Sequence, residues 1–174
     1  STKWDQIVPR VLNWDLVLHK RPMQVAVVGG GAGGCELLLS IHHRLCEKLT
    51  KLGIENPAKV FQMYVATRSD QILSSHPPKV QRIFRRVLKE RNIDVHYDSE
   101  IIDVITKKNE KENGGLLITI HNIQIPFDEC VWCTSAATQP WLRDTGLALN
   151  TYGFIAVKDT LQSTNDKNIF ACGD

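Results

Sequence analysis

The chain has 174 residues, of which 43% are hydrophobic and 23% are charged, so its composition is that of a globular protein with one sizeable core. Its 21 basic residues exceed its 19 acidic residues by only two, which gives no indication of nucleic-acid binding. No apolar run approaches the roughly 20 residues of a membrane span, and the polar amino terminus does not resemble a secretory signal. Five cysteines, an odd number, favour reduced thiols and a cytoplasmic location over a secreted disulfide framework.

Residues 1–22 are predicted to form a helical lead-in segment. Its apolar side chains recur at helical spacing, and they are Trp4, Ile7, Val8, Val11 and Leu12. Pro9 would distort such a helix because proline lacks the backbone N–H group. We expect an amphipathic segment that packs against the rest of the protein.

Residues 24–97 alternate between predicted strands and predicted helices. The apolar run 24–28 ends abruptly in glycine, and a continuous run of this kind is typical of a strand buried on both faces. The remaining elements of this part are a helix at 35–52, a strand at 60–66, a helix around 80–88 and a strand at 94–97. This βαβαβ order predicts the core of an open parallel sheet.

The second half of the chain carries shorter strand patterns. We expect strands at 101–106, 116–121 and 123–126, with the polar stretch 107–115 as an exposed hairpin tip. These strands predict an antiparallel β-meander inserted after the parallel strands. Further strands are predicted at 130–133, 154–157 and 169–171.

A glycine motif follows the first predicted strand. Gly29, Gly31 and Gly34 fit the pattern G-x-G-x-x-G at the start of a predicted helix. In this context the first glycine permits a tight turn, the second lets the backbone approach a pyrophosphate, and the third lets helix and strand pack closely. The start of the helix adds free N–H groups and the positive end of the helix dipole. With Gly30, these residues predict a dinucleotide site; a glycine-rich turn without a ligand is the alternative.

The predicted fold class is therefore α/β, a Rossmann-like three-layer NAD(P)-binding domain with a parallel sheet and an inserted antiparallel β-meander. We place this domain at residues 23–150, after the lead-in of residues 1–22. Residues 151–174 are expected to form a return segment that leads away from it.

The second predicted strand ends where a site of this kind normally places an acidic residue that binds the ribose hydroxyls. Thr67 occupies that position, and Arg68 follows it. A cation here would suit the 2′-phosphate of NADP, whereas Asp70 is a competing candidate. The choice between NADH and NADPH stays open.

Two further stretches carry a family resemblance. Residues 169–174 read as an apolar strand ending in Ala-Cys-Gly-Asp, and residues 131–136 read Val-Trp-Cys-Thr-Ser-Ala. Together with the glycine motif, they resemble the two-dinucleotide-binding flavoproteins of the pyridine nucleotide-disulfide oxidoreductase superfamily. The resemblance implies four further cofactor-binding residues, two beside the nucleotide and two on the FAD, which are Thr134, Ser135, Gly173 and Asp174. At one of these, Ser135, the family usually has glycine.

The glycine motif continues into Gly-Cys-Glu at residues 34–36, as in the NADH dehydrogenase-like branch of that superfamily. Residues 25–39, 67–77 and 137–153 look like the flavoprotein domain that is joined to selenide, water dikinase. The resemblance implies that Glu36 reaches the nicotinamide ribose or carboxamide. It covers nearly the whole chain but only the middle of such a protein. We therefore expect an excised nicotinamide-nucleotide domain, whose partners are the FAD-binding domain and a selenide, water dikinase domain of the same polypeptide.

These observations predict the NAD(P)H-binding domain of an FAD-dependent oxidoreductase, in which hydride passes from nicotinamide to flavin. As a fragment, the chain would be inactive by itself. No side chain is predicted to act as a catalytic acid, base or nucleophile, or as a metal ligand. Two alternatives stay open: a non-catalytic nucleotide-sensing or interaction module, and an S-adenosylmethionine-dependent methyltransferase, which would not explain the Gly-Asp ending.

Several cysteines are weaker candidates for chemistry. Cys130 and Cys133 have the spacing of a redox pair, but in a strand they would point to opposite faces. His42 and Cys46 lie one helical turn apart, without the further ligands of a tetrahedral metal site. The position of Cys35 at a helix start can lower a thiol pKa, although apolar packing explains it better.

Overall fold

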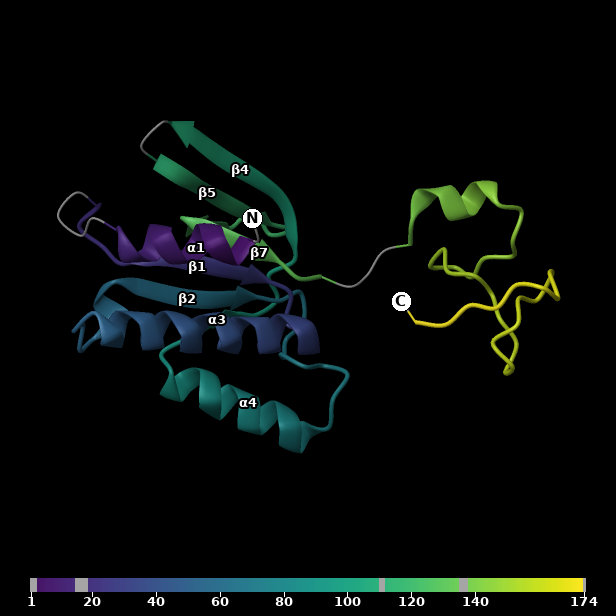
Figure 1. The fold of residues 1–174 in the computed structure, drawn as a ribbon, viewed down its shortest axis with the longest axis horizontal. Coiled ribbons are helices and arrows are strands. Elements are labelled where there is room, and N and C mark those ends of the chain that lie inside the picture. The colour runs from purple at the N-terminus through teal and green to yellow at the C-terminus, as the bar shows by residue number, and fades with distance from the viewer. Residues whose placement is uncertain (1–2, 15–18, 110–111, 135–137, 174) are drawn as a thin grey trace. The chain divides into compact units, whose positions relative to one another are not determined.

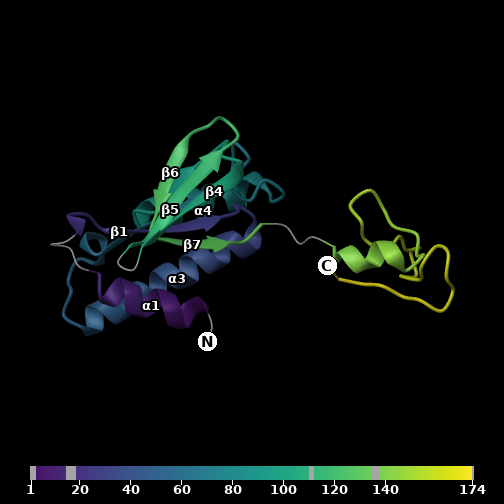
Figure 2. The same cartoon turned by 90° about the horizontal axis from the view of Figure 1, so that it is seen from above.

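The computed structural model describes residues 3–14, 19–109, 112–134 and 138–173. The chain divides into two compact units, residues 1–134 and residues 135–174. The first unit consists of helices, a parallel sheet and a small antiparallel sheet, which Figure 1 and Figure 2 show from two directions. Across the described ranges, no helix is both long enough and apolar enough to cross a membrane.

The parallel sheet has four strands in the order β3-β2-β1-β7. They are β1 Met23–Val28, β2 Phe61–Ala66, β3 Asp94–His96 and β7 Glu129–Trp132. The corresponding predicted strands are confirmed to within one residue at each end. Strand β1 pairs with a neighbour on both sides and is covered on both faces, which explains its continuous apolar sequence.

Helices supply the apolar side chains on one face of this sheet. They are α1 Lys3–Leu12, α3 Ala32–Lys51 and α4 Pro78–Glu90, and a short 3-10 helix, η1 Pro57–Lys59, precedes β2. Val25 and Val27 of β1 are buried with Ile7 and Val11 of α1 in what we call the helix-side cluster. Helix α1, which occupies residues 3–12 of the predicted lead-in 1–22, is therefore amphipathic and continues through Pro9.

An antiparallel sheet in the order β4-β5-β6 covers the opposite face. Its strands are β4 Ile101–Asn109, β5 Glu112–Thr119 and β6 Gln124–Phe127. The buried residues between the two sheets form what we call the meander-side cluster: Ala26, Val28, Tyr64, Leu117, Ile125 and Phe127. Successive residues of β1 thus point to opposite clusters, as strand geometry requires. The predicted three-layer α/β fold with an inserted meander is confirmed.

The hairpin between β4 and β5 has a shorter tip than the sequence predicts. The two strands remain paired out to Asn109 and Glu112, so most of the predicted tip at 107–115 is strand. Pairing uses the backbone N–H and C=O groups, which every residue of this stretch possesses, and it does not require apolar side chains. A polar composition therefore did not mark the end of the strand here.

The described part of the second unit, residues 138–173, contains a short 3-10 helix, η2 Pro140–Asp144, and three single antiparallel bridges. The bridges join Leu149 to Ile155, Val157 to Ser163 and Gln162 to Phe170. The predicted strands at 154–157 and 169–171 are therefore wrong. Their residues meet a bridge partner at isolated positions only, so no continuous ladder forms.

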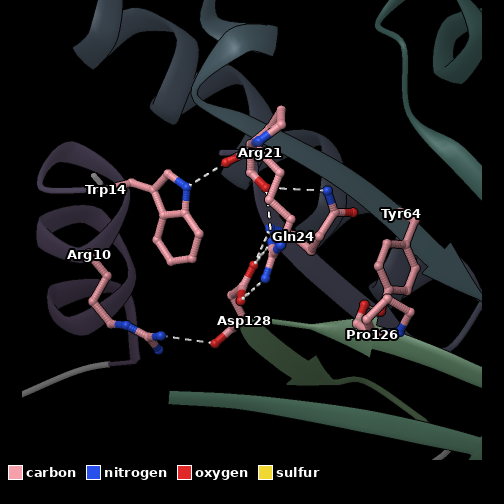
Figure 3. Close-up of polar contacts among 8 residues, drawn as sticks. Arg10, Trp14, Arg21, Gln24, Tyr64, Pro126 and Asp128 are labelled. Carbon is pink, nitrogen blue, oxygen red and sulfur yellow. Dashed lines mark hydrogen bonds and ion pairs between the residues drawn. The ribbon is translucent and has the colours of Figure 1, made fainter. Parts of the chain in front are cut away.

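A buried carboxylate ties the lead-in to the amino-terminal edge of the parallel sheet (Figure 3). Asp128, which immediately precedes β7, accepts two hydrogen bonds from the Arg21 guanidinium at 2.5 and 2.8 Å and one from the Gln24 N–H at 2.7 Å. Arg10 of α1 donates to the Asp128 carbonyl oxygen at 3.0 Å and pairs with the Glu129 carboxylate. We call these five residues the Asp128 clasp.

We expect Asp128→Ala to lower the free energy of unfolding by about 2 kcal/mol, because it removes a buried acceptor from the Arg21 guanidinium and the Gln24 N–H. Urea unfolding of the variant and the wild type measures the difference. Glu47→Ala removes exposed ion pairs on α3 and is the control, with a much smaller expected change. Equal losses in the two variants would contradict a special contribution of the clasp.

Candidate functional site

The carboxyl ends of β2, β1 and β7 lie side by side at one edge of the sheet, because these strands are parallel neighbours. From β1 the chain passes to β2 and β3 on one side and later returns to β7 on the other. The position between β1 and β7 is therefore the topological switch point of the sheet. Open α/β sheets bind ligands at the carboxyl ends of their strands at such a point.

The segment Gly29–Gly31, which we call the glycine loop, leaves β1 at this point. The Gly29 N–H donates to the Ala66 carbonyl at 2.9 Å, and the Cys133 N–H donates to the Val28 carbonyl at 2.8 Å. Gly29 has a φ of +123°, and a Cβ atom there would lie 2.0 Å from the Cys133 carbonyl oxygen. Only glycine fits this position.

Close packing also constrains two other glycines of the motif. A Cβ atom on Gly30 would lie 2.6 Å from the Thr67 side chain, and one on Gly34 would lie 1.9 Å from the Gly29 carbonyl oxygen. Gly31 differs, because it is exposed and a Cβ atom there would meet nothing within 4 Å. The open side of the glycine loop is therefore at Gly31, where the sequence predicts the approach of a pyrophosphate.

Helix α3 begins at Ala32, three residues before its predicted start, and Gly31 is its N-cap residue. The Cys35 N–H makes the first helical hydrogen bond, to the Gly31 carbonyl at 3.0 Å. The N–H groups of residues 32–34 therefore have no acceptor within the helix. The first turn carries no acidic side chain, so nothing there opposes the positive end of the helix dipole. This arrangement can hold a phosphate group.

The residues after β2 separate into a buried residue and two exposed ones. Thr67 is only 5% exposed, packs against Gly30 and donates its N–H to the His96 carbonyl at 2.9 Å. Arg68 and Asp70 are exposed, so their charged groups are accessible to a ligand. The predicted contact of Thr67 with a ribose stays a prediction.

The cysteines next to the glycine loop are packing residues. Cys35 is fully buried with its Sγ 3.6 Å from the Gly30 carbonyl oxygen. Burial, together with the nearby Cys133 and Glu36, raises the pKa of Cys35 to about 11, so the thiol is neutral at physiological pH. Cys133 packs against the helix-side cluster and Cys130 against the meander-side cluster, which confirms that these two side chains point to opposite faces.

The other predicted cofactor-binding residues are distributed over both units. Glu36 is exposed on α3, and Thr134 is exposed shortly after β7. Gly173 is exposed in the second unit. Ser135 and Asp174 lie outside the described residues.

His42 and Cys46 lie next to each other on α3, with the Cys46 Sγ 3.8 Å from each ring nitrogen. Burial lowers the pKa of His42 and raises that of Cys46, which favours the neutral form of each. Among the residues that the structure describes, no three metal-ligating side chains come together.

One contact of the glycine loop was absent from the sequence analysis. The Leu73 N–H donates to the Gly30 carbonyl oxygen at 2.8 Å, from the long loop that follows β2. The available signal was the apolar pair Ile72 and Leu73, which interrupts an otherwise polar stretch and is buried. The glycine motif alone carries no information about this neighbour.

We expect Gly34→Ala to lower the free energy of unfolding by about 2 to 3 kcal/mol, because the new methyl group overlaps the Gly29 carbonyl oxygen. Gly31→Ala is the matched control, since its methyl group enters open space; its expected cost is about 1 kcal/mol or less. Urea unfolding of both variants is the measurement. If Gly34→Ala were as stable as Gly31→Ala, the close approach of α3 to the loop would be wrong.

The sequence matches known proteins over most of its length. The model of the family described as pyridine nucleotide-disulphide oxidoreductase matches residues 12–174. The chain is 28% identical over 163 residues to the type II NADH:quinone oxidoreductase of Haemophilus influenzae, covering 91% of this chain and 34% of that protein. It is 25% identical over 156 residues to the probable NADH dehydrogenase of Dictyostelium discoideum, covering 90% and 33%. The chain thus spans about a third of the length of these relatives.

A solved structure shares the fold. The crystal structure of a FAD-dependent pyridine nucleotide-disulphide oxidoreductase from Desulfovibrio vulgaris matches with a TM-score of 0.64 and 21% identity. The match covers 91% of this chain and 37% of that one. It agrees with the layered α/β arrangement described above.

Proposed function

Because the chain belongs to the pyridine nucleotide-disulphide oxidoreductase family, we propose that it is the NAD(P)H-binding domain of an FAD-dependent oxidoreductase. One observation carries this proposal: the glycine loop leaves β1 at the switch point of the sheet, with its open side beside the start of α3. The relatives named above include a type II NADH:quinone oxidoreductase and a protein named as a probable NADH dehydrogenase, which supports a nicotinamide nucleotide as the ligand.

The residues at this edge of the sheet fit a dinucleotide. The backbone at Gly31 leaves room for a pyrophosphate, and the free N–H groups at the start of α3 would donate to its oxygens. Arg68 and Thr67, at the end of β2, would lie on the adenosine side, and Glu36 and Thr134 would lie towards the nicotinamide. When both cofactors are bound, the nicotinamide supplies a hydride that the flavin accepts. The part of this chain is to bind the nucleotide and fix its orientation.

The second unit is the part of the chain that we assign to the contact with a further domain. Trp141, Tyr152 and Phe170 of this unit are 60%, 80% and 63% exposed. We propose that this unit, with Gly173 and Asp174, contacts an FAD-binding domain of the same polypeptide. The matches named above offer no support for a selenide, water dikinase domain as an additional partner.

A non-catalytic nucleotide-sensing module is the second candidate. The position at which an acidic residue would bind the ribose holds Thr67, whose side chain is buried under Gly30. Both candidates require nucleotide binding, but only the first requires hydride transfer. Reduction of bound FAD by NADH in a longer polypeptide that contains this chain distinguishes them.

We expect Gly31→Val to weaken NADH binding at least about tenfold, equivalent to about 1.4 kcal/mol. The valine methyl groups would occupy the open side of the glycine loop, where the pyrophosphate must approach the backbone. Calorimetric titration of the 174-residue chain measures the two dissociation constants. Ala58→Val, on the exposed η1 at the other edge of the sheet, is the control and should bind as the wild type does. Unchanged affinity in Gly31→Val would put the nucleotide elsewhere.

We expect Arg68→Ala to weaken NADPH binding about three- to tenfold more than NADH binding, because the exposed guanidinium can pair with a 2′-phosphate. The measured quantity is the ratio of the two dissociation constants at fixed salt. Asp70→Ala is the matched variant and should shift the ratio in the opposite direction, since it removes a negative charge. A ratio that Arg68→Ala leaves unchanged would show that Arg68 does not select the nucleotide.

A further inference from the structure

The loop between β2 and α4, residues 67–77, reaches back to the glycine loop. Its contact is the hydrogen bond from the Leu73 N–H to the Gly30 carbonyl oxygen at 2.8 Å. Leu73 has a φ of +54°, a left-handed conformation that costs a residue with a side chain about 1 to 2 kcal/mol. Leu73 is nevertheless only 3% exposed and its neighbour Ile72 is fully buried, so packing holds the strained backbone in place.

A buried amide on α4 holds the same loop. Gln81 is 6% exposed, and its Nε2 donates to the His76 carbonyl at 2.9 Å and to the Leu73 carbonyl at 3.3 Å. Both neighbours are carbonyl oxygens, so only the nitrogen of the amide can face them. The two amide hydrogens thereby join α4 to both ends of the turn that contains Leu73.

These contacts form a continuous chain from α4 to the glycine loop. The Gln81 amide donates to the Leu73 carbonyl at 3.3 Å beside the His76 N–H, which donates to it at 2.8 Å, and the Leu73 N–H donates to the Gly30 carbonyl. The Thr67 side chain occupies the space beside Gly30 on the side of β2. The orientation of the Gly30 peptide, which leads directly into the open position at Gly31, therefore depends on a side chain that lies outside the glycine motif.

We propose that Gln81 is a positioning residue for the dinucleotide: through Leu73 it holds the glycine loop in the shape that receives the pyrophosphate. The proposal rests on the proposed function, since it concerns the affinity of the same site. Gln81 itself does not touch the nucleotide. It lowers the cost of binding by keeping the glycine loop ordered before the ligand arrives.

The test uses Gln81→Met, which keeps the length of the side chain and its helix propensity but removes the amide donors. We expect the dissociation constant for NADH, measured by calorimetry on the 174-residue chain, to rise about fivefold to tenfold. The matched control is Tyr64→Phe, which removes a hydrogen bond from a buried hydroxyl to the Pro126 carbonyl at 2.7 Å, in the meander-side cluster (Figure 3). That variant should lose stability without losing affinity.

Amide hydrogen exchange of the wild type supplies a readout that a general loss of stability would not reproduce. NADH should slow exchange of the Leu73 N–H, because a bound nucleotide would stabilise the loop conformation in which this N–H donates to the Gly30 carbonyl. In Gln81→Met the same amide should exchange faster, while the amides of β1 keep their rates.

Each outcome decides the inference. An affinity of Gln81→Met within about twofold of the wild type would overturn it. Equal losses of affinity in Gln81→Met and Tyr64→Phe would also overturn it, because the effect would then follow stability alone. If NADH does not change the exchange rate of the Leu73 N–H, nucleotide binding is not linked to the Leu73–Gly30 contact, and the inference is overturned. A wild type that binds no NADH at all would refute the proposed function itself, which is a different result.

Discussion

Three strand ends converge on the glycine loop, and the atoms packed around it leave no room for a side chain at Gly29, Gly30 or Gly34. The neighbours that fill the space are the Cys133 carbonyl, the Thr67 side chain and the loop's own backbone. The packing of β2 and β7 against β1 therefore limits the conformations that the loop can adopt. A site built in this way is ordered before a ligand arrives, which reduces the conformational entropy lost on binding.

Strand β1 gives this loop a rigid base because both of its faces are covered. Val25 and Val27 point to the helix-side cluster, and Ala26 and Val28 point to the meander-side cluster. Removing either outer layer would expose half of the strand from which the loop emerges. The antiparallel sheet thus contributes to the site without supplying a residue to it.

The sequence predicted those features that depend on local patterns. Apolar runs such as 24–28 marked the parallel strands, and the position of Gly31 after such a run marked the site. Pairing between distant segments was harder to predict: Phe170 lies in an apolar run, yet it meets a single bridge partner. The burial of Thr67 and the contact of Leu73 with Gly30 depend on tertiary packing, which no spacing rule describes.

The Asp128 clasp joins residues that are far apart in the chain, with a sequence separation of 119 for Arg10 and Glu129 and of 107 for Arg21 and Asp128. Closing a loop of this length costs chain entropy that is recovered only after most of the first unit has become ordered. The clasp therefore requires both ends of the first unit to be present and in place. The apolar face of α1 around Ile7 and Val11 packs in the helix-side cluster with residues of β1, α3 and β2, all of which leave the ribosome before β7, so only the clasp must wait for the far end of the unit.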